Sequence, residues 1–289
     1  MKPKNLSTKI FLDSGDPQET KKIILELGWL DGQTTNPTLI AKNPDAMQRL
    51  TVGKKFNREE IFAFYRGIVE KISEQIPRGS VSIEVYADEH TTAQEMIAQG
   101  KEMFKWIPNA HIKLPITSAG LEAAEKLVKD GLRVNMTLCF SQAQAAAVYA
   151  ATCGAIRGQV FISPFDGRLD DRHEHGMDLI KNIQKMYASG DGHVELLVAS
   201  IRTVNHLLYS LYLKTDIITV PTSIIKDWIV LGSPVPTSMP DVDEGVLGSK
   251  HIVYENYDIE APWWTFDISH PLTQKGIVKF SADWNNLTK

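Results

Sequence analysis

The chain has 289 residues, of which 43% are hydrophobic and 23% are charged, with a formal net charge of −4. Positive and negative charges are mixed along the chain, which argues against a nucleic-acid-binding surface. No apolar run is long enough to span a membrane, and the first residues lack the apolar core of a secretory signal. Two cysteines are too few for a disulfide framework. We therefore expect a cytoplasmic enzyme without nucleic-acid or membrane partners, folded as one barrel-sized domain or two ordinary ones.

Short strand patterns alternate with amphipathic helix patterns along most of the chain. Strands are predicted at Lys9–Asp13, Gly32–Thr34, Val81–Val85, Ala110–Leu114, Arg133–Thr137, Gln159–Ile162, Val194–Val198 and Asp216–Val220. Helices are predicted at Pro17–Leu27, Arg58–Gln75, Thr91–Ala98, Ser118–Lys129, Ser141–Ala151, Gly176–Ala188, Thr203–Leu213 and Ile224–Val230, with a short extra helix near Asp45–Leu50. Eight such units without a break in composition predict one (β/α)8 barrel, a TIM barrel, over residues 1–231.

The pattern changes after Leu231. Three prolines fall between Gly232 and Gly245, and aromatic residues gather between Tyr254 and Trp264. We expect residues 232–269 to form an extension, either a surface linker or a flap over the barrel. Residues 270–289 are expected to form a C-terminal helix that packs on its own barrel or on that of a neighbouring subunit. The sequence is therefore compatible with a homo-oligomer.

A lysine in the fourth predicted strand indicates where the chemistry lies. Lys113 follows the apolar Ile112, and burial disfavours an ammonium ion, which leaves a neutral amine able to attack a carbonyl. Asp13, Glu84 and Thr137 end or follow other strands, and strand carboxyl ends converge in a barrel. For each residue alone an ion pair, a cap or a snorkelling side chain is the commoner role. Their joint placement favours Schiff-base aldol chemistry, with a carboxylate as the base.

Asn36 lies in a polar loop after the second predicted strand, and this loop allows two interpretations. The loop is either a turn whose side chains bond the backbone, with Pro37 opening a helix, or a binding loop. In the second case the amide of Asn36 faces a substrate hydroxyl or Lys113. The sequence alone does not decide between them.

Two arginines follow the sixth and seventh strands. Arg168 and Arg202, together with a serine hydroxyl, could hold a phosphate by charge-assisted hydrogen bonds. The alternative for Arg168 is an ion pair with one of three nearby acids, which are Asp166, Asp170 and Asp171.

Two stretches resemble metal sites without fitting one. The two histidines of Arg172–His175 are two residues apart in a polar connection, for which a solvated loop is favoured. Asp241–Gly245 resembles the start of a calcium loop, but Ile252 falls where the bidentate glutamate should be. No metal site is predicted.

Five motifs, in chain order, resemble the transaldolase family. They are Phe11–Gly15, Asp31–Ile40, Ile112–Pro115, Asn135–Gln144 and Ile162–Arg168, and the similarity runs from about Lys9 to Trp228 and returns in His270–Trp284. The resemblance implies a barrel with a Schiff-base lysine on its fourth strand, which matches Lys113. It also implies transfer of a dihydroxyacetone unit from a ketose phosphate to an aldose phosphate, in the pentose phosphate pathway and without a cofactor. Sedoheptulose 7-phosphate and glyceraldehyde 3-phosphate are the expected substrate pair.

The resemblance further implies the roles of individual residues. The residue matching Asp13 deprotonates the C4 hydroxyl, and those matching Glu84 and Thr137 hold the catalytic water. The implied substrate-binding residues are Asn36, Asn135 and Ser163 at the hydroxyls, Phe165 nearby, and Arg168, Ser200 and Arg202 at the phosphate.

Two alternatives to a transaldolase remain. Fructose-6-phosphate aldolases of the same family release dihydroxyacetone, but they usually have tyrosine at the position of Phe165 and glutamine at that of Glu84. The second alternative is a barrel that binds sugar phosphates without catalysis, because a fold does not fix a function.

Overall fold

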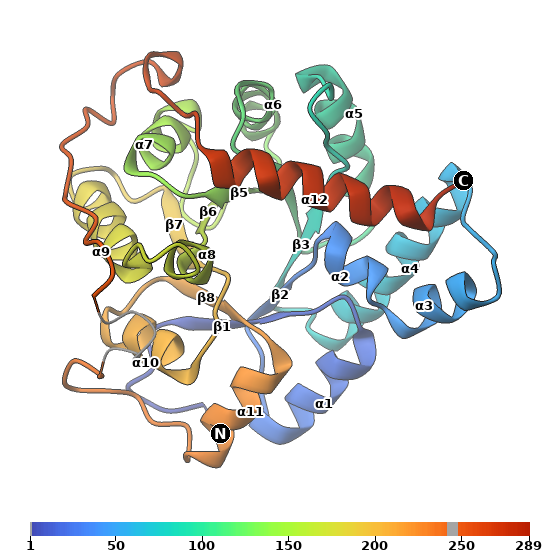
Figure 1. Ribbon diagram of the computed structural model, residues 1–289, viewed down its shortest axis with the longest axis horizontal. Coiled ribbons are helices and arrows are strands. Elements are labelled where there is room, and N and C mark those ends of the chain that lie inside the picture. Colours follow the sequence, from blue (N-terminus) through green and yellow to red (C-terminus); the bar gives the residue numbers. More distant parts are fainter. Residues whose placement is uncertain (1, 242–247) are drawn as a thin grey trace.

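The computed structural model describes residues 2–241 and 248–289, and its eight strands close into one parallel barrel (Figure 1). Most of the acidic stretch 241–245 therefore lies outside the described residues. Each strand pairs with the next in sequence, and β8 pairs with β1. The strands are β1 Lys9–Asp13, β2 Gly32–Thr34, β3 Ser80–Glu84, β4 Ala110–Pro115, β5 Val134–Cys139, β6 Val160–Pro164, β7 Val194–Val198 and β8 Ile217–Val220. The predicted (β/α)8 barrel is confirmed.

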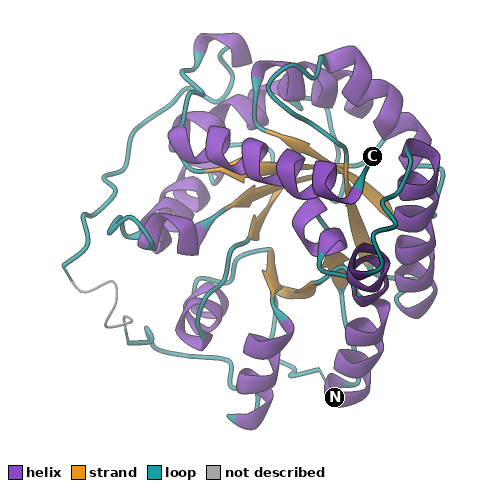
Figure 2. Cartoon of the chain, turned by 45° about the vertical axis from the view of Figure 1, so that its right-hand side comes forward, coloured by secondary structure: helices purple, strands orange, loops and turns teal. Residues whose placement is uncertain are grey.

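Among the described residues, eight of the helices follow the strands in turn, and Figure 2 shows helices around the outside of the strands. The eight helices are α1 Pro17–Leu27, α4 Arg58–Gln75, α5 Ala93–Met103, α6 Ser118–Lys129, α7 Gln142–Ala151, α9 Gly176–Tyr187, α10 Val204–Tyr212 and α11 Thr222–Val230. Within the described ranges, no helix is both long enough and apolar enough to cross a membrane.

Two short helices lie between β2 and α4, namely α2 Pro37–Ala41 and α3 Pro44–Thr51. Helix α3 is the extra helix expected near Asp45–Leu50, and α2 begins at Pro37, as one interpretation of the Asn36 loop allowed. Each begins with a proline, and the asparagine before it accepts a hydrogen bond from a backbone N–H of the first turn. Proline at the first position and asparagine at the cap favour a new helix start, which explains the second helix. A further short helix that was not predicted, α8 Asp166–Asp170, follows β6.

The strand register places the polar residues of the barrel interior beside one another. Lys113 of β4 is the register partner of Glu84 in β3 and of Asn135 in β5. Because side chains alternate between the two faces of a strand, partners in a parallel register point to the same side of the sheet. The three side chains therefore form one layer near the carboxyl end of the barrel, its mouth.

His111 lies two residues before Lys113, on the same face of β4 and deeper in the barrel. Its ring stacks on Phe161 with 4.0 Å between centroids. Its nitrogens lie 2.7 Å from the Ser80 Oγ and 3.0 Å from the Gly158 carbonyl oxygen. Burial lowers the pKa of His111 to about 3.

This shift predicts an acid sensitivity of the fold. The unfolded chain binds a proton at His111 below about pH 6.5, whereas the folded chain binds it only near pH 3. The free energy of unfolding should therefore fall as pH drops through this window, by up to about 1.4 kcal/mol per pH unit. Urea unfolding of His111→Gln between pH 7 and pH 4 should show a flatter dependence than wild type. His90→Gln, at an exposed histidine, is the control and should keep the wild-type slope.

After α11 the chain leaves the barrel and runs along its outer face. Gln142 of α7 donates a hydrogen bond from Nε2 to the Val253 carbonyl oxygen at 2.8 Å. The 3-10 helix η2 Trp263–Thr265 packs on α7, and the Trp263 indole N–H donates to Glu125 Oε2 of α6 at 3.0 Å. The Asn182 Nδ2 group of α9 donates to the Ile252 carbonyl oxygen at 2.8 Å. Residues 248–269 thus run along the outside of α9, α7 and α6.

The C-terminal helix α12, Pro271–Leu287, returns across the mouth of its own barrel and packs on α2 and β5 (Figure 1, red). A glycine permits its close approach. A Cβ at Gly276 would lie 2.6 Å from Leu138 Cδ2 and 3.1 Å from an Arg168 Nη. The end of the helix is fixed where the Phe56 N–H donates to the Leu287 carbonyl oxygen at 2.8 Å.

Candidate active site

Lys113 lies inside the barrel mouth in contact with Glu84. The Lys113 side chain is 4% exposed, and its Nζ lies 2.8 Å from Glu84 Oε2 and 3.5 Å from the Thr35 carbonyl oxygen. Burial raises the pKa of Glu84, while the neighbouring Lys113 acts in the opposite direction. A carboxylate at this distance can take the ammonium proton, which leaves an amine able to add to a carbonyl.

Asp13 is the second carboxyl group of the mouth, at the end of β1. Its Oδ1 accepts a hydrogen bond from Thr34 Oγ1 at 2.7 Å. Burial raises the pKa of Asp13, and the charge of Lys113 and the Thr34 hydrogen bond partly offset this rise. A carboxyl group whose pKa is raised exchanges its proton more readily near neutral pH, as a general acid or base must.

Three hydroxyl and amide groups from β5 and β6 continue this polar interior. Ser163 Oγ donates to Asn135 Oδ1 at 2.7 Å, and Asn135 Nδ2 donates to Ser82 Oγ at 3.0 Å. The Thr137 hydroxyl is fully buried and has no hydrogen-bond partner among the described residues. An unsatisfied buried hydroxyl costs about 1–3 kcal/mol, so its position favours a bound polar group in the mouth.

Asn36 caps a helix and still has an amide group to offer. Its Oδ1 accepts a hydrogen bond from the Leu39 N–H at 2.9 Å, at the start of α2. The turn that the sequence allowed is therefore present. The Nδ2 group donates to no described residue, so the binding role is compatible with the capping role.

The two arginines lie in neighbouring segments, Arg168 in α8 after β6 and Arg202 in the loop after β7, and the backbones of these segments are hydrogen-bonded. The Gly167 N–H donates to the Ser200 carbonyl oxygen at 3.2 Å. The Arg168 guanidinium lies 5.0 Å from the centre of the Phe165 ring. Burial lowers the pKa of Arg168, and the positive charge of Arg202 lowers it further. Arg168 is partly buried and forms no ion pair within the described residues, so its charge suits a phosphate site.

The ion pair considered for Arg168 is not formed. Asp171 Oδ2 lies 2.9 Å from Nη2 of Arg202, and both side chains are at least half exposed. The other two acids, Asp166 and Asp170, face His206 instead. The alternative interpretation was therefore wrong for Arg168, whereas Arg202 does form a surface ion pair.

The chain matches, over residues 10–289, the family model described as Transaldolase/Fructose-6-phosphate aldolase. It belongs to that family. A probable transaldolase from Dehalococcoides mccartyi is 34% identical over 281 residues, which cover 97% of this chain and all of the relative. A probable transaldolase from Ruegeria sp. (strain TM1040) is 40% identical over 223 residues, which cover 76% of this chain and 88% of the relative. A crystal structure of 3-hexulose-6-phosphate synthase from Salmonella typhimurium aligns with a TM-score of 0.48 and 10% identity, over 78% of this chain and 99% of that one.

Backbone strain marks Ser200, for which the family resemblance implied a phosphate contact. Ser200 has a φ of +65°, in the left-handed region that a non-glycine residue rarely adopts. Such conformations cost free energy and cluster at functional sites, where the surrounding structure enforces them. The strained residue lies between β7 and Arg202, where the sequence had placed a phosphate contact.

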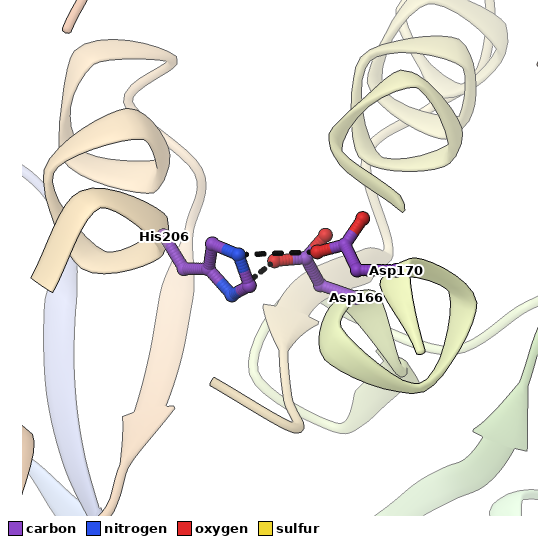
Figure 3. A group of neighbouring side chains, drawn as sticks. All are labelled: Asp166, Asp170 and His206. Atoms are coloured by element: carbon purple, nitrogen blue, oxygen red, sulfur yellow. Dashed lines mark ion pairs between the residues drawn. The ribbon is translucent and has the colours of Figure 1, made fainter. Parts of the chain in front are cut away.

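Three side chains with metal-ligating atoms gather beside the arginine loops of the enzyme. Asp166, Asp170 and His206 each offer one such atom, and these atoms lie within 4.8 Å of one another (Figure 3). The sequence had predicted no metal site, and a solvated loop was favoured at Arg172–His175, where Arg172 forms an ion pair with Glu174 at 3.2 Å.

Phe280 of α12 is a residue of the site that the sequence reasoning missed. Its ring centre lies 5.9 Å from Lys113 Nζ and 5.6 Å from the Arg168 guanidinium carbon, and the side chain is buried. Helical spacing from Trp284 could have identified Phe280 as a buried position, since residues four apart share a helix face. Its contact with the lysine depends on how α12 crosses the barrel, which the sequence pattern does not give.

Proposed function

We propose that this enzyme is a transaldolase that moves a dihydroxyacetone unit through a Schiff base on Lys113. The donor is a ketose phosphate, sedoheptulose 7-phosphate or fructose 6-phosphate, and the acceptor is an aldose phosphate, as in the pentose phosphate pathway. The observation that carries the proposal is the buried contact between Lys113 and Glu84 at 2.8 Å. Asp13 and Thr137 in the same mouth supply the other groups that the reaction needs.

The first step forms the imine. Neutral Nζ of Lys113 attacks C2 of the ketose and gives a carbinolamine. Glu84 and the unpartnered Thr137 hydroxyl hold the water that carries protons between nitrogen and oxygen, so that the C2 oxygen leaves as water. The product is an iminium ion at C2, which attracts electrons from the C3–C4 bond.

The second step breaks that bond. Asp13 takes the proton of the C4 hydroxyl, C4 becomes the carbonyl carbon of the departing aldose phosphate, and the electron pair of the C3–C4 bond forms an enamine on Lys113. The acceptor aldehyde then takes the place of the departed product. The enamine attacks its carbonyl carbon, Asp13 returns the proton to the new hydroxyl, and hydrolysis of the imine releases the new ketose phosphate.

The phosphate of donor and acceptor binds at the other end of the site. Arg168, Ser200 and Arg202 come from the loops after β6 and β7, and Asn36, Asn135 and Ser163 face the hydroxyls between phosphate and lysine. Burial of Arg168 and its repulsion by Arg202 favour a dianion between them. The phosphate thereby orients the sugar chain with C2 toward Nζ.

A coupled assay tests this proposal against its two alternatives. The protein with sedoheptulose 7-phosphate and glyceraldehyde 3-phosphate should produce erythrose 4-phosphate and fructose 6-phosphate in equal amounts. A lyase would instead release free dihydroxyacetone even when the acceptor is saturating. A non-catalytic barrel would bind the ketose phosphate and give neither product. Phe165 and Glu84, where the family's aldolases usually have tyrosine and glutamine, favour the first outcome.

Replacement of Phe280 should shift the balance between transfer and hydrolysis. The ring covers both Lys113 and Arg168, so Phe280→Ala should admit water to the enamine between departure of one aldose and arrival of the next. We expect the share of free dihydroxyacetone among the products to rise about threefold or more, because closure of a site suppresses hydrolysis of reactive intermediates. Val278→Ala, at an exposed position of the same helix, is the matched control. Equal shares in both variants would show that Phe280 does not exclude water.

A further inference from the structure

His206 bridges two aspartates in a cluster that the proposed reaction does not use. Its Nδ1 lies 3.0 Å from Asp166 Oδ2, and its Nε2 lies 3.1 Å from Asp170 Oδ2 (Figure 3). The histidine lies in the first turn of α10 and both aspartates lie in α8. Asp166 is fully buried and His206 is 6% exposed. We call these three residues the histidine clasp.

The two contacts place the ring between two carboxylates of one short helix. The Arg202 N–H donates a hydrogen bond to His206 Nδ1 at 3.4 Å, so the lone pair of this nitrogen is directed at the backbone of the neighbouring loop. The ring thereby touches three points, which are the carboxylates of Asp166 and Asp170 in α8 and the backbone just before α10. A metal ion bound at Nδ1 would have to displace the backbone N–H. The contacts therefore fit a bridge between the two segments better than a metal ligand.

The clasp connects the two elements that carry the phosphate-binding groups. Arg168 lies in α8 between the two aspartates, and Arg202 lies four residues before His206. The Arg202 backbone nitrogen is itself 3.4 Å from His206 Nδ1. The backbones of the two loops also meet, since the Asp166 N–H donates to the Ala199 carbonyl oxygen at 3.1 Å. The clasp therefore links the backbone of α8, which carries Arg168, to the backbone just before α10, which carries Arg202.

The packing around the clasp leaves little freedom for α8 to move. A Cβ at Gly176, the first residue of α9, would come within 2.3 Å of Asp166 Oδ1. The Gly176 N–H donates to Asp170 Oδ1 at 2.9 Å. Asp170 therefore uses one oxygen for α9 and the other for His206, which makes the carboxylate a joint between three helices.

We propose that His206 is a positioning residue for phosphate recognition, which acts by holding α8 and α10 together through Asp166 and Asp170. The clasp sets the distance between Arg168 and Arg202 before the substrate arrives, so that the phosphate meets a preformed pair of cations. The proposal rests on the proposed function, in which these arginines bind the sugar phosphate. It predicts that loss of the clasp weakens recognition of the phosphate and spares the chemistry at Lys113.

Kinetics with phosphorylated and unphosphorylated acceptors test this proposal. For Asp170→Asn and for His206→Gln we expect kcat/KM with glyceraldehyde 3-phosphate to fall about tenfold, mostly through KM, as for a lost binding contribution. With glyceraldehyde, which has no phosphate, both variants should stay within about twofold of wild type. The double variant should lose no more than the larger single effect, because both changes break one bridge. Asp170→Asn keeps an oxygen that can accept the hydrogen bond of the Gly176 N–H. This variant alone can therefore test the proposal if His206→Gln does not fold.

Controls separate failure of the clasp from failure of the proposed function. His193→Gln changes another buried histidine that faces an aspartate, just before β7 at the other end of the barrel, and should preserve the preference for the phosphorylated acceptor. If the clasp variants keep this preference while Arg168→Ala loses it, the clasp proposal is wrong and the phosphate site stands. If Arg168→Ala also keeps it, the phosphate site is wrong and the clasp proposal falls with it. Stabilisation of wild type but not of His206→Gln by added Zn²⁺ would identify a metal site and overturn the clasp.

Discussion

Lys113→Ala is expected to abolish transfer, with a fall in kcat of at least about 10⁴-fold, because the covalent intermediate cannot form without the amine. Borohydride reduction in the presence of fructose 6-phosphate should add the mass of the reduced sugar or of the dihydroxyacetone unit to the wild-type peptide that contains Lys113. The variant should gain no adduct. Lys129→Ala removes an exposed lysine that pairs with Glu125 and should keep both the activity and the label.

Folding of the Lys113→Ala variant must be tested as well, because removal of the lysine leaves the Glu84 carboxyl group buried without its partner. Loss of one charge from a buried pair is destabilising by about 3–5 kcal/mol when the other stays ionised. Burial already raises the pKa of Glu84, and without Lys113 the main opposing influence disappears. Glu84 should then stay protonated, which limits the loss of stability. Lys113→Met fills most of the same space and should unfold at a higher temperature than Lys113→Ala. An active Lys113→Met with a labelled residue elsewhere would refute the Schiff-base assignment.

The sequence predicted those parts of the site that depend on strand position. Asp13, Glu84 and Lys113 lie at the mouth because each ends or nearly ends an apolar run, and a parallel barrel brings such positions together. The predicted boundaries were close to the observed ones. Strand β5, for example, was expected at 133–137 and is found at Val134–Cys139. Local propensity and hydrophobic periodicity are sufficient for this level of description.

The parts that the sequence did not predict depend on contacts between distant segments. Phe280 is one buried residue among several on α12, and only the path of this helix over the mouth brings its ring to Lys113. Asp166 and Asp170 were considered as partners of Arg168 because they are close in sequence. In the fold they face His206, 36 residues or more along the chain. Hydrophobic periodicity in the sequence predicts neither of these contacts. The raised pKa values of Asp13 and Glu84 also depend on burial in the assembled barrel.

Asp13→Ala should separate imine formation from bond cleavage. Lys113 and Glu84 remain in place in this variant, so borohydride should still trap the ketose phosphate on the lysine. Turnover should fall about 10²–10⁴-fold, the range that a general base contributes. The trapped species should be mainly the intact sugar, whereas wild type should also yield the dihydroxyacetone adduct. Mass spectrometry of the reduced protein distinguishes the two, since they differ by the mass of the departing aldose phosphate.

Thr34→Val changes the pKa of Asp13 without removing its carboxyl group, and it should shift the pH dependence of kcat in a predictable direction. The Thr34 hydroxyl donates to Asp13 and lowers the pKa of Asp13, so its removal should raise that pKa further. Asp13 must be ionised to take the C4 proton, and the rate of cleavage falls as pH drops through its pKa. The acidic limb of the kcat profile should therefore move to higher pH in Thr34→Val, with little change at alkaline pH. A limb that stays in place, together with an Asp13→Ala variant at the wild-type rate, would show that another group accepts the proton.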